Sequence, residues 1–387
     1  MSDEHAAWVA LASVDGVGPA TFARLIAAFG DATAVLAAAR RGHFIERLRT
    51  AEGRERGEPG GLPIALAEGV AAAAARPDEE LRRLDALGAR AVTWRDAAYP
   101  KRLRGLDDAP PALFVRGSAE ALSTARAAAV VGTRRPTPAG RSFAGAAGAA
   151  IASCGAAVIS GLAFGIDAAA HAAVIEAGGV TVAVVGSGLA DLRPAAHRRL
   201  ADDIVAAGGA IVSESRSDAR PMKGTYPRRN RLIAGLAEAV VVVEAPSRSG
   251  AINTAHWAAT LGRDLYVVPG RPWEATTAGC VALLHDVPGA RPVVDVPTLL
   301  TDLGLVGGDG TQHGGTALEA VFVGLSTIEA ALARRLRRGP ASPDRLAADC
   351  GLPIEEVAAG LSLLELRGYA WSSGPLYLAG GALRDAR

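Results

Sequence analysis

Two glycine-containing turns, each placed after an apolar run, are the features of this sequence best suited to bind phosphate. They consist of Gly132, Thr133, Arg134 and Arg135 after the run AAAVV, and of Ser160 and Gly161 after AAVI. A glycine turn between a strand and a helix points backbone N–H groups at a phosphate. The threonine hydroxyl can donate a hydrogen bond, and the arginines add positive charge. The pattern predicts an anion-binding edge on the protein.

A basic segment, RSDARPMKGTYPRRNR, spans residues 216–231 and is the second chemical signal. Its six cations, against the one acid Asp218, are Arg216, Arg220, Lys223, Arg228, Arg229 and Arg231, with Tyr226 and Asn230 between them. Cations that neutralise phosphates, next to an aromatic ring on which a base can stack, are typical of a groove for single-stranded nucleic acid. A solvated basic loop is the alternative. It is less favoured because the segment follows a predicted strand at the same edge as the first turn.

Three weaker patterns suggest other chemistry. Asp167 and His171 are four residues apart on a predicted helix, which suits acid–base work or a metal, but no third ligand follows at a recognisable spacing. A first-turn aspartate and a locally bonded histidine are the favoured interpretation. Gly186-Ser187-Gly188 with Glu214 is a partial dinucleotide fingerprint that lacks its third glycine. We therefore expect no catalytic residue, no metal and no cofactor.

The elements that must position these turns alternate between strands and Ala-rich helices. Apolar runs predict strands at 128–132, 156–160, 180–186, 210–213, 239–244 and 264–268, preceded by ARAVTW and PALFVRG. Continuous rather than alternating apolar runs indicate strands that are buried on both faces. The pattern predicts an α/β fold with a parallel, doubly wound sheet and ligands at the carboxyl ends of its strands.

The predicted sheet is flanked by two smaller parts. Residues 1–85 are mainly helical, and Gly16-Val17-Gly18-Pro19 resembles a helix-hairpin-helix turn, although a tight turn between packed helices is the favoured alternative. The sheet domain is expected over 86–300, a Gly-rich linker over 301–316, and a second domain over 317–387. Three helices and a hairpin predict a winged helix there, with Ser342 as an N-cap. Glu355, Glu356 and Glu365 on its third helix argue against phosphate contact by that helix.

Composition limits the class of protein. The 41 Lys and Arg residues nearly balance the 40 Asp and Glu residues, which argues against a uniformly basic surface but not against a local basic groove. The three cysteines are far apart and share no metal-ligand spacing, which suits a reducing compartment. No apolar run is long enough to span a bilayer, and the acidic N-terminus does not resemble a signal peptide. We expect a soluble cytoplasmic protein without a membrane partner.

Taken together, several segments resemble the DNA-processing protein A family (DprA, also called Smf). They include VVGTRRPTPAG (130–140), SGLAFGIDAAAH (160–171), VVGSGL (184–189), YPRRNRLIAGLAEAVVVVEA (226–245), SGAINTAHWA (249–258) and VVPG (267–270). The similarity covers roughly residues 90–290 in order and spacing, and it rests on many motifs rather than one. The helical start and the winged-helix end match the usual flanks of this family more loosely.

The resemblance implies an extended Rossmann-like domain that binds single-stranded DNA without sequence preference. It also implies a homodimer that loads the RecA recombinase onto incoming DNA during natural transformation. Carried over by position, the phosphate turn corresponds to Gly132, Thr133 and Arg134, the second turn to Ser160 and Gly161, and the basic segment to Lys223, Arg229, Asn230 and Arg231. The family's Tyr-Pro-Lys is replaced here by Arg193-Pro194-Ala195, with Arg193, Arg198 and Arg199 as candidate substitutes for the lysine.

Two other classes of function remain as alternatives. A nucleotide-processing enzyme of the phosphoribohydrolase type uses the same kind of sheet, but its PGG-x-GT signature is absent after the comparable strand, where APSRSG stands at 245–250. An NAD-dependent oxidoreductase is disfavoured by the incomplete glycine pattern. A binder of single-stranded DNA predicts tight binding of oligo-dT with little effect of AMP or NAD, whereas saturable binding of a mononucleotide with turnover would favour the nucleotide-processing enzyme.

Overall fold

The computed structural model describes residues 3–51, 64–220, 224–306, 325–336, 341–366, 369–373 and 376–379. The chain forms two compact units, the first ending at Val306 and the second starting at Gly307. The first unit holds a nine-stranded sheet and a set of N-terminal helices, and the second is small and mainly helical.

The nine-stranded sheet has the order β1-β2-β6-β5-β4-β3-β7-β8-β9. Its strands are β1 (Ala89–Thr93), β2 (Ala112–Gly117), β3 (Ala127–Val131), β4 (Ala157–Ser160), β5 (Thr181–Val184), β6 (Ala210–Ser213), β7 (Ala239–Val242), β8 (Asp264–Val267) and β9 (Ala290–Pro292). The seven strands from β3 to β9 run parallel to one another, and β2 pairs antiparallel with both β6 and β1. The predicted doubly wound parallel sheet is therefore confirmed, with an antiparallel pair added at one edge.

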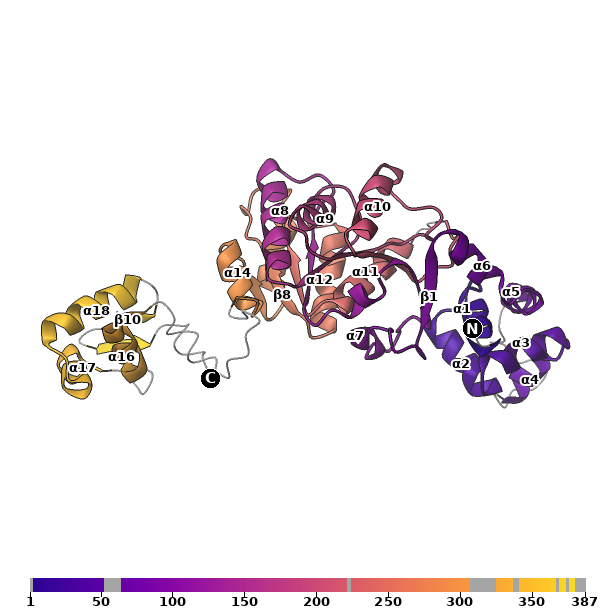
Figure 1. The fold of residues 1–387 in the computed structure, drawn as a ribbon, viewed down its shortest axis with the longest axis horizontal. Coiled ribbons are helices and arrows are strands. Elements are labelled where there is room, and N and C mark those ends of the chain that lie inside the picture. Colours follow the sequence, from indigo (N-terminus) through magenta and orange to yellow (C-terminus); the bar gives the residue numbers. More distant parts are fainter. Residues whose placement is uncertain are drawn as a thin grey trace. The chain divides into compact units, whose positions relative to one another are not determined.

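Helices cover both faces of this sheet, as Figure 1 shows for α8 and α9 on one side and α11 and α12 on the other. One face is covered by α8 (Pro138–Ser153), α9 (Ile166–Glu176), α10 (Arg198–Ala206) and α14 (Val296–Asp302). The other is covered by α7 (Lys101–Arg104), α11 (Thr225–Leu236), α12 (Gly250–Thr260) and α13 (Ala278–Asp286). Because both faces are covered, every residue of β3 is buried, which explains its continuous apolar sequence.

The order of the parallel strands reverses next to β3. From β3 the chain adds β4, β5 and β6 on one side, and then crosses to add β7, β8 and β9 on the other. The helix after β3, α8, and the helix after β7, α12, consequently lie on opposite faces of the sheet. Between them, outside the carboxyl ends of β3 and β7, the fold leaves a crevice, which is where open α/β sheets bind their ligands.

The N-terminal helices pack beside the antiparallel edge of the sheet (Figure 1). They are α1 (Asp3–Ala12), α2 (Pro19–Phe29), α3 (Ala32–Arg40), α4 (Phe44–Ala51), α5 (Ile64–Ala75) and α6 (Glu79–Ala86). The Trp8 indole N–H donates a 2.8 Å hydrogen bond to the Pro111 carbonyl just before β2, and its ring contacts Trp94 and Phe22. These contacts attach the helical layer to the sheet.

The second unit contains the predicted helices and hairpin of a winged helix. Its elements are α16 (Thr327–Leu336), α17 (Pro343–Cys350), α18 (Ile354–Leu366), β10 (Ala370–Ser373) and β11 (Leu376–Ala379). Leu332, Leu346 and Leu361 form the centre of its core. The hydroxyl oxygen of Ser342 accepts the Arg345 N–H, which confirms the predicted N-cap. Gly368, the expected end of the third helix, lies outside the described residues.

Some short elements of the structure have no recognisable signal in the sequence. Strand β9 is three residues long and partly exposed, so it leaves no apolar run in the sequence. The helix α7 and the one-turn 3-10 helices η1 (Glu120–Ser123) and η2 (Ala195–His197) lie in segments without helical periodicity. Within the described ranges no single helix is long and apolar enough to cross a membrane, although the bent pair α2 and α3 passes the same test together.

His171 and Asp167 are held inside the first unit rather than facing solvent together. The hydroxyl of Thr181 donates to the Val158 carbonyl, so it accepts a 2.7 Å hydrogen bond from His171 Nδ1. The His171 ring is completely buried, and this burial, reinforced by His197 and Arg229, lowers the pKa of His171 to about 3. Within the described segments, no cluster of three or more potential ligands resembles a metal site.

The buried imidazole predicts a specific acid sensitivity of the fold. Its folded-state pKa of about 3 lies below the unfolded value. Below about pH 6.5, the unfolded chain therefore takes up a proton that the folded chain cannot accept. The free energy of unfolding should fall by up to about 1.4 kcal/mol per pH unit as the pH drops through this window. In urea titrations between about pH 6.5 and 5, His171→Asn, whose amide can still donate to Thr181, should show a flatter slope than the parent. Parallel slopes would show that His171 is not the group responsible.

Candidate nucleic-acid interface

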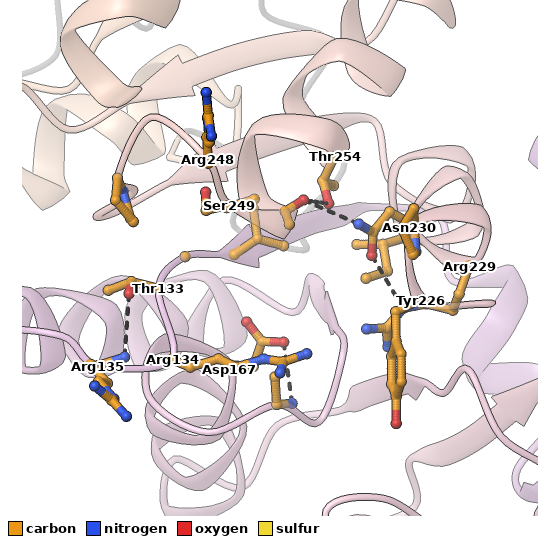
Figure 2. A pocket seen from close by; sticks show the side chains of 18 residues that line it. Thr133, Arg134, Arg135, Asp167, Tyr226, Arg229, Asn230, Arg248, Ser249 and Thr254 are labelled. Atoms are coloured by element: carbon orange, nitrogen blue, oxygen red, sulfur yellow. Dashed lines mark hydrogen bonds between the residues drawn. The ribbon is translucent and has the colours of Figure 1, made fainter. Parts of the chain in front are cut away.

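A cationic hollow of about 490 Å³ occupies the crevice between β3 and β7. We call it the rim groove, and it is lined mainly by the loop 132–135 after β3, the first turns of α11 (226–230), the loop 246–250 after β7, and Asp167 below. Figure 2 shows these side chains gathered around the same space from different elements. The rim groove thus assembles segments that are separated by more than a hundred residues in the sequence.

The loop after β3 carries two exposed arginines on a fixed backbone. The Thr133 N–H donates to the carbonyl of Glu244, two residues after β7, and the Thr133 carbonyl accepts the Ile166 N–H. These bonds join the loop to both neighbouring segments. Arg134 and Arg135 consequently project from a rigid position, and both side chains are exposed to solvent. The structure places the predicted cations of this turn where an anion can reach them.

Arg134 meets Tyr226 across the groove. Its guanidinium carbon lies 5.8 Å from the centroid of the tyrosine ring, within the range of a cation–π contact (Figure 2). Arg134 comes from the loop after β3, and Tyr226 from the first turn of α11. The predicted phosphate turn and the predicted basic segment are therefore neighbours in space, as the interpretation of the sequence requires.

The second glycine turn, Ser160 and Gly161, does not line the rim groove. The Ser160 hydroxyl is buried and donates a 2.6 Å hydrogen bond to the Val130 carbonyl, so it is not available to a ligand. Our prediction of Ser160 as a direct DNA contact is wrong for that reason. A side chain at Gly161 would lie 2.7 Å from the Arg229 guanidinium and 2.8 Å from Asp167 Oδ2. Glycine is needed there because two charged groups approach the backbone closely.

Arg229 and Asp167 are buried charged residues that line the rim groove. Arg229 donates to the carbonyl oxygens of Gly161 and Val184, and burial lowers its pKa to about 10 despite the nearby Asp167. One Asp167 carboxylate oxygen accepts the N–H groups of Gly161 and Ala163 at 3.1 and 3.3 Å. Burial raises the pKa of Asp167, and the charge of Arg229 opposes that rise. Arg229 thereby holds the ends of β4 and β5 to α11.

The remaining predicted residues of the basic segment separate into different environments. Arg228 is exposed, whereas Asn230 is buried and its amide donates to the Gly250 carbonyl and to Asn253. Asn230 thereby ties α11 to α12 at the edge of the rim groove. Lys223 lies outside the described residues.

Arg231 requires a correction. Its side chain is 1% exposed and forms ion pairs of 2.5 Å with Asp108 and 2.8 Å with Glu214. It also does not line the rim groove. Burial alone would lower the pKa of Arg231, but the two carboxylates outweigh it and raise the pKa. A guanidinium that is already neutralised by two carboxylates cannot bind phosphate, so the structure assigns Arg231 to stabilising the fold.

Arg248 is a groove residue that the sequence analysis did not select. It follows β7, is exposed, and lies across the hollow from Arg134 and Arg135 (Figure 2). The neighbouring Ser249 caps α12 by accepting the Ile252 N–H. Only the position of Arg248 after β7 could indicate a binding role, because the loop after β7 must border the crevice once the strand order is known.

The partial dinucleotide motif does not form a nucleotide site of the expected kind. Glu214, which would bind a ribose hydroxyl in such a site, is only 15% exposed and is paired with Arg231. Phe164, which follows the groove residue Ala163 in the chain, is 46% exposed and packs edge-on against the His197 ring at 4.6 Å between centroids. The pairing of Glu214 with Arg231 therefore leaves this motif without a free carboxylate for a ribose.

Sequence comparison identifies the family. Three family models match the chain. The model of the DNA recombination-mediator protein A family matches residues 90–304, that of the DprA winged helix domain matches residues 323–372, and that of the DprA-like N-terminal HHH domain matches residues 2–51. The chain belongs to the DNA recombination-mediator protein A family, DprA or Smf. The putative DNA processing protein DprA of Mycobacterium tuberculosis is 37% identical over 310 residues, which cover 76% of this chain and 78% of that protein.

Solved structures of DprA proteins share the fold. The crystal structure of DNA processing protein A from Streptococcus pneumoniae matches with a TM-score of 0.62 at 28% identity, covering 78% of this chain and 99% of that one. The DprA of Helicobacter pylori, whose structure was described for its single-stranded DNA binding mode, matches with a TM-score of 0.50 at 28% identity. That match covers 55% of this chain and 95% of the Helicobacter chain.

The assignment of Arg231 to the fold predicts how three substitutions should differ. Arg231→Ala should lower the free energy of unfolding by about 3 kcal/mol, because it leaves two carboxylates without their partner. Arg231→Lys should recover only part of this loss, since an ammonium cannot bridge both carboxylates as a guanidinium does. Arg228→Ala, an exposed neighbour on the same helix, should change stability by less than about 0.5 kcal/mol. Urea unfolding measures all three. An Arg231→Ala protein of unchanged stability that has lost DNA affinity would return this residue to the binding surface.

Proposed function

We propose that this DprA family member binds single-stranded DNA in the rim groove without sequence preference and delivers it to the RecA recombinase in the cytoplasm during DNA uptake. The observation that carries the proposal is the meeting of Arg134 and Tyr226 at the crevice between β3 and β7. It supplies a cation for a phosphate and a ring for a base at one point. The single-stranded DNA binding described for the Helicobacter relative supports the same assignment.

The chemistry of the rim groove favours binding over sequence reading. Its exposed charged groups, Arg134, Arg135 and Arg248, are all cations, which suit phosphates of any sequence. An aromatic ring such as Tyr226 stacks on any base, because every base has a π-face. The arrangement therefore predicts strong salt dependence and weak discrimination between bases.

The same groove is poorly equipped for hydrolysis. Among the described residues that line it, Asp167 is the one carboxylate. One of its carboxylate oxygens is occupied by two backbone N–H groups, and the side chain is almost completely buried. The Ser249 hydroxyl is engaged in capping α12. These arrangements support a binding role and disfavour the phosphoribohydrolase alternative.

Delivery to RecA and action as a homodimer are further parts of the proposal. The family description, recombination mediator, supports transfer of the bound strand to a recombinase. A single hollow of about 490 Å³ holds few nucleotides. Two copies that bind one strand would gain affinity through effective concentration, without any new contact.

Arg134→Ala tests the rim groove. Loss of one phosphate contact and one stacking partner should weaken binding of oligo-dT about tenfold, which corresponds to about 1.4 kcal/mol. The slope of log affinity against log salt, measured by fluorescence anisotropy between about 50 and 200 mM salt, should become less steep by about one unit. Arg41→Ala, an exposed arginine on the N-terminal helices away from the groove, is the matched control. Equal affinity and slope in both variants, or saturable AMP binding with turnover, would contradict the proposed function.

RecA loading has its own test. On DNA coated with a single-strand binding protein, the parent protein should shorten the lag of RecA filament formation, and Arg134→Ala should not do so at equal concentration. The readout is RecA ATP hydrolysis, which begins when filaments form. Adding excess variant to saturate the DNA should restore activity if binding alone is impaired. A parent protein that binds DNA tightly and leaves the lag unchanged would remove RecA from the proposal while leaving the DNA site intact.

A further inference from the structure

A second hollow of about 780 Å³ lies beside the rim groove, between the N-terminal helices and the sheet. We call it the hairpin groove, and define it by the turn 15–21 before and within α2, the segment 214–220 after β6, Arg228 of α11, and Trp257 of α12. Both grooves are lined by Pro227 and Arg229, so they adjoin at the start of α11. Tyr226, which lines the rim groove, also lies against Gly186, which lines the hairpin groove.

The exposed charge of the hairpin groove is mainly positive. Arg220 and Arg228 are exposed, and Arg216 is partly exposed. Arg216 is paired with Asp15 and Asp218, and Arg228 lies 3.7 Å from Glu214. Two other carboxylates at this groove, those of Glu214 and Asp108, share the single positive charge of Arg231. Arg220 has no ion pair with any described carboxylate and faces the groove with its charge uncompensated.

The turn between α1 and α2 meets the basic segment directly. A side chain at Gly18 would lie 3.1 Å from Arg228 Nη2, so a glycine lets this arginine rest against the turn. No described side chain caps the N-terminus of α2, which begins with Pro19 at the edge of the groove. The N–H groups of its first turn therefore add to the positive potential of the arginines. Trp257 of α12 also lines the groove, is partly exposed, and provides an aromatic surface.

We propose that the hairpin groove is a second segment of the single-stranded DNA path, which continues from the rim groove past Tyr226 to the Gly16–Gly18 turn. The inference rests on the proposed function of the rim groove. The phosphates of the continuing strand face Arg220 and Arg228, and Trp257 stacks on a base. The N-terminal helices then have a direct binding role in the same chain, because they form one wall of the groove.

The dependence of binding affinity on oligonucleotide length can distinguish the contributions of the two grooves. An oligo-dT of about six nucleotides is short enough to be held by one groove, whereas one of about twenty reaches both. Arg220→Glu in the full chain should weaken binding of the long oligonucleotide about tenfold and leave the short one within about twofold. Arg41→Glu applies the same charge change to an exposed arginine outside both grooves, and should affect neither length.

A second variant is chosen so that weaker binding cannot be explained by loss of the folded state. Thr21 lines the groove in the first turn of α2, where a glutamate favours the helix dipole. Thr21→Glu should therefore keep or raise stability while it weakens binding of the long oligonucleotide about fivefold. Ala27→Glu, on an exposed position near the other end of the same helix, is its control.

Photo-crosslinking locates the strand. Oligo-dT carrying 5-iodouracil at single positions should crosslink to Tyr226 from one part of the strand and to Trp257 from a part further along. The Trp257 crosslink should disappear in Arg220→Glu. If both charge variants bind long and short strands like the parent, the hairpin groove is not on the path, whereas the rim groove stands. If the parent fails to bind oligo-dT of either length, the proposed function itself is lost.

Discussion

The separation of α8 and α12 onto opposite faces of the sheet is the constraint on which the binding surface depends. Both helices follow neighbouring parallel strands, β3 and β7, and each must pack its apolar side on a different face. The loops that enter them diverge, and no helix covers the space between their starts. Polar loop residues and helix N-termini are all that can border this space, so it collects groups that attract anions.

The arginines of the basic segment illustrate how one helix serves both structure and binding. On α11, Arg228 faces solvent, Arg229 donates to carbonyls beneath the groove, and Arg231 is buried between two carboxylates. A buried guanidinium is tolerated only where its donors and charge are satisfied. Carbonyl oxygens accept the hydrogen bonds of Arg229, and two carboxylates pair with Arg231. The two buried arginines, Arg229 and Arg231, hold α11 in place, so that the exposed side chains of this helix have a fixed orientation toward solvent.

The antiparallel edge of the sheet connects the helical layer to this surface. β2 continues the sheet beyond β6, and Trp8 bonds to the chain just before β2. The turn between α1 and α2 is thereby brought against the segment that leaves β6 and against Arg228. A feature that is ambiguous in isolation, a single Gly-x-Gly turn, gains a defined chemical environment from this packing.

Much of this protein follows from its sequence because the determining patterns are local. Continuous apolar runs such as AAVV before Gly132 indicate strands covered on both faces, and the alternation of strands with Ala-rich helices predicts the doubly wound sheet. The cations at Arg134 and at 216–231, with Tyr226 among them, indicate a groove for a nucleic-acid strand. Family similarity agrees with these patterns over most of the chain.

Tertiary structure alone decided which of the polar residues are available. The hydroxyl of Ser160, the guanidinium of Arg231 and the exposed side chain of Arg248 have ordinary residue types and positions in the sequence. Their roles depend on partners far along the chain: the Val130 carbonyl, the carboxylates of Asp108 and Glu214, and the crevice beside β3. Burial and charge pairing are properties of the packed molecule, because they depend on which distant groups the fold brings within a few ångströms.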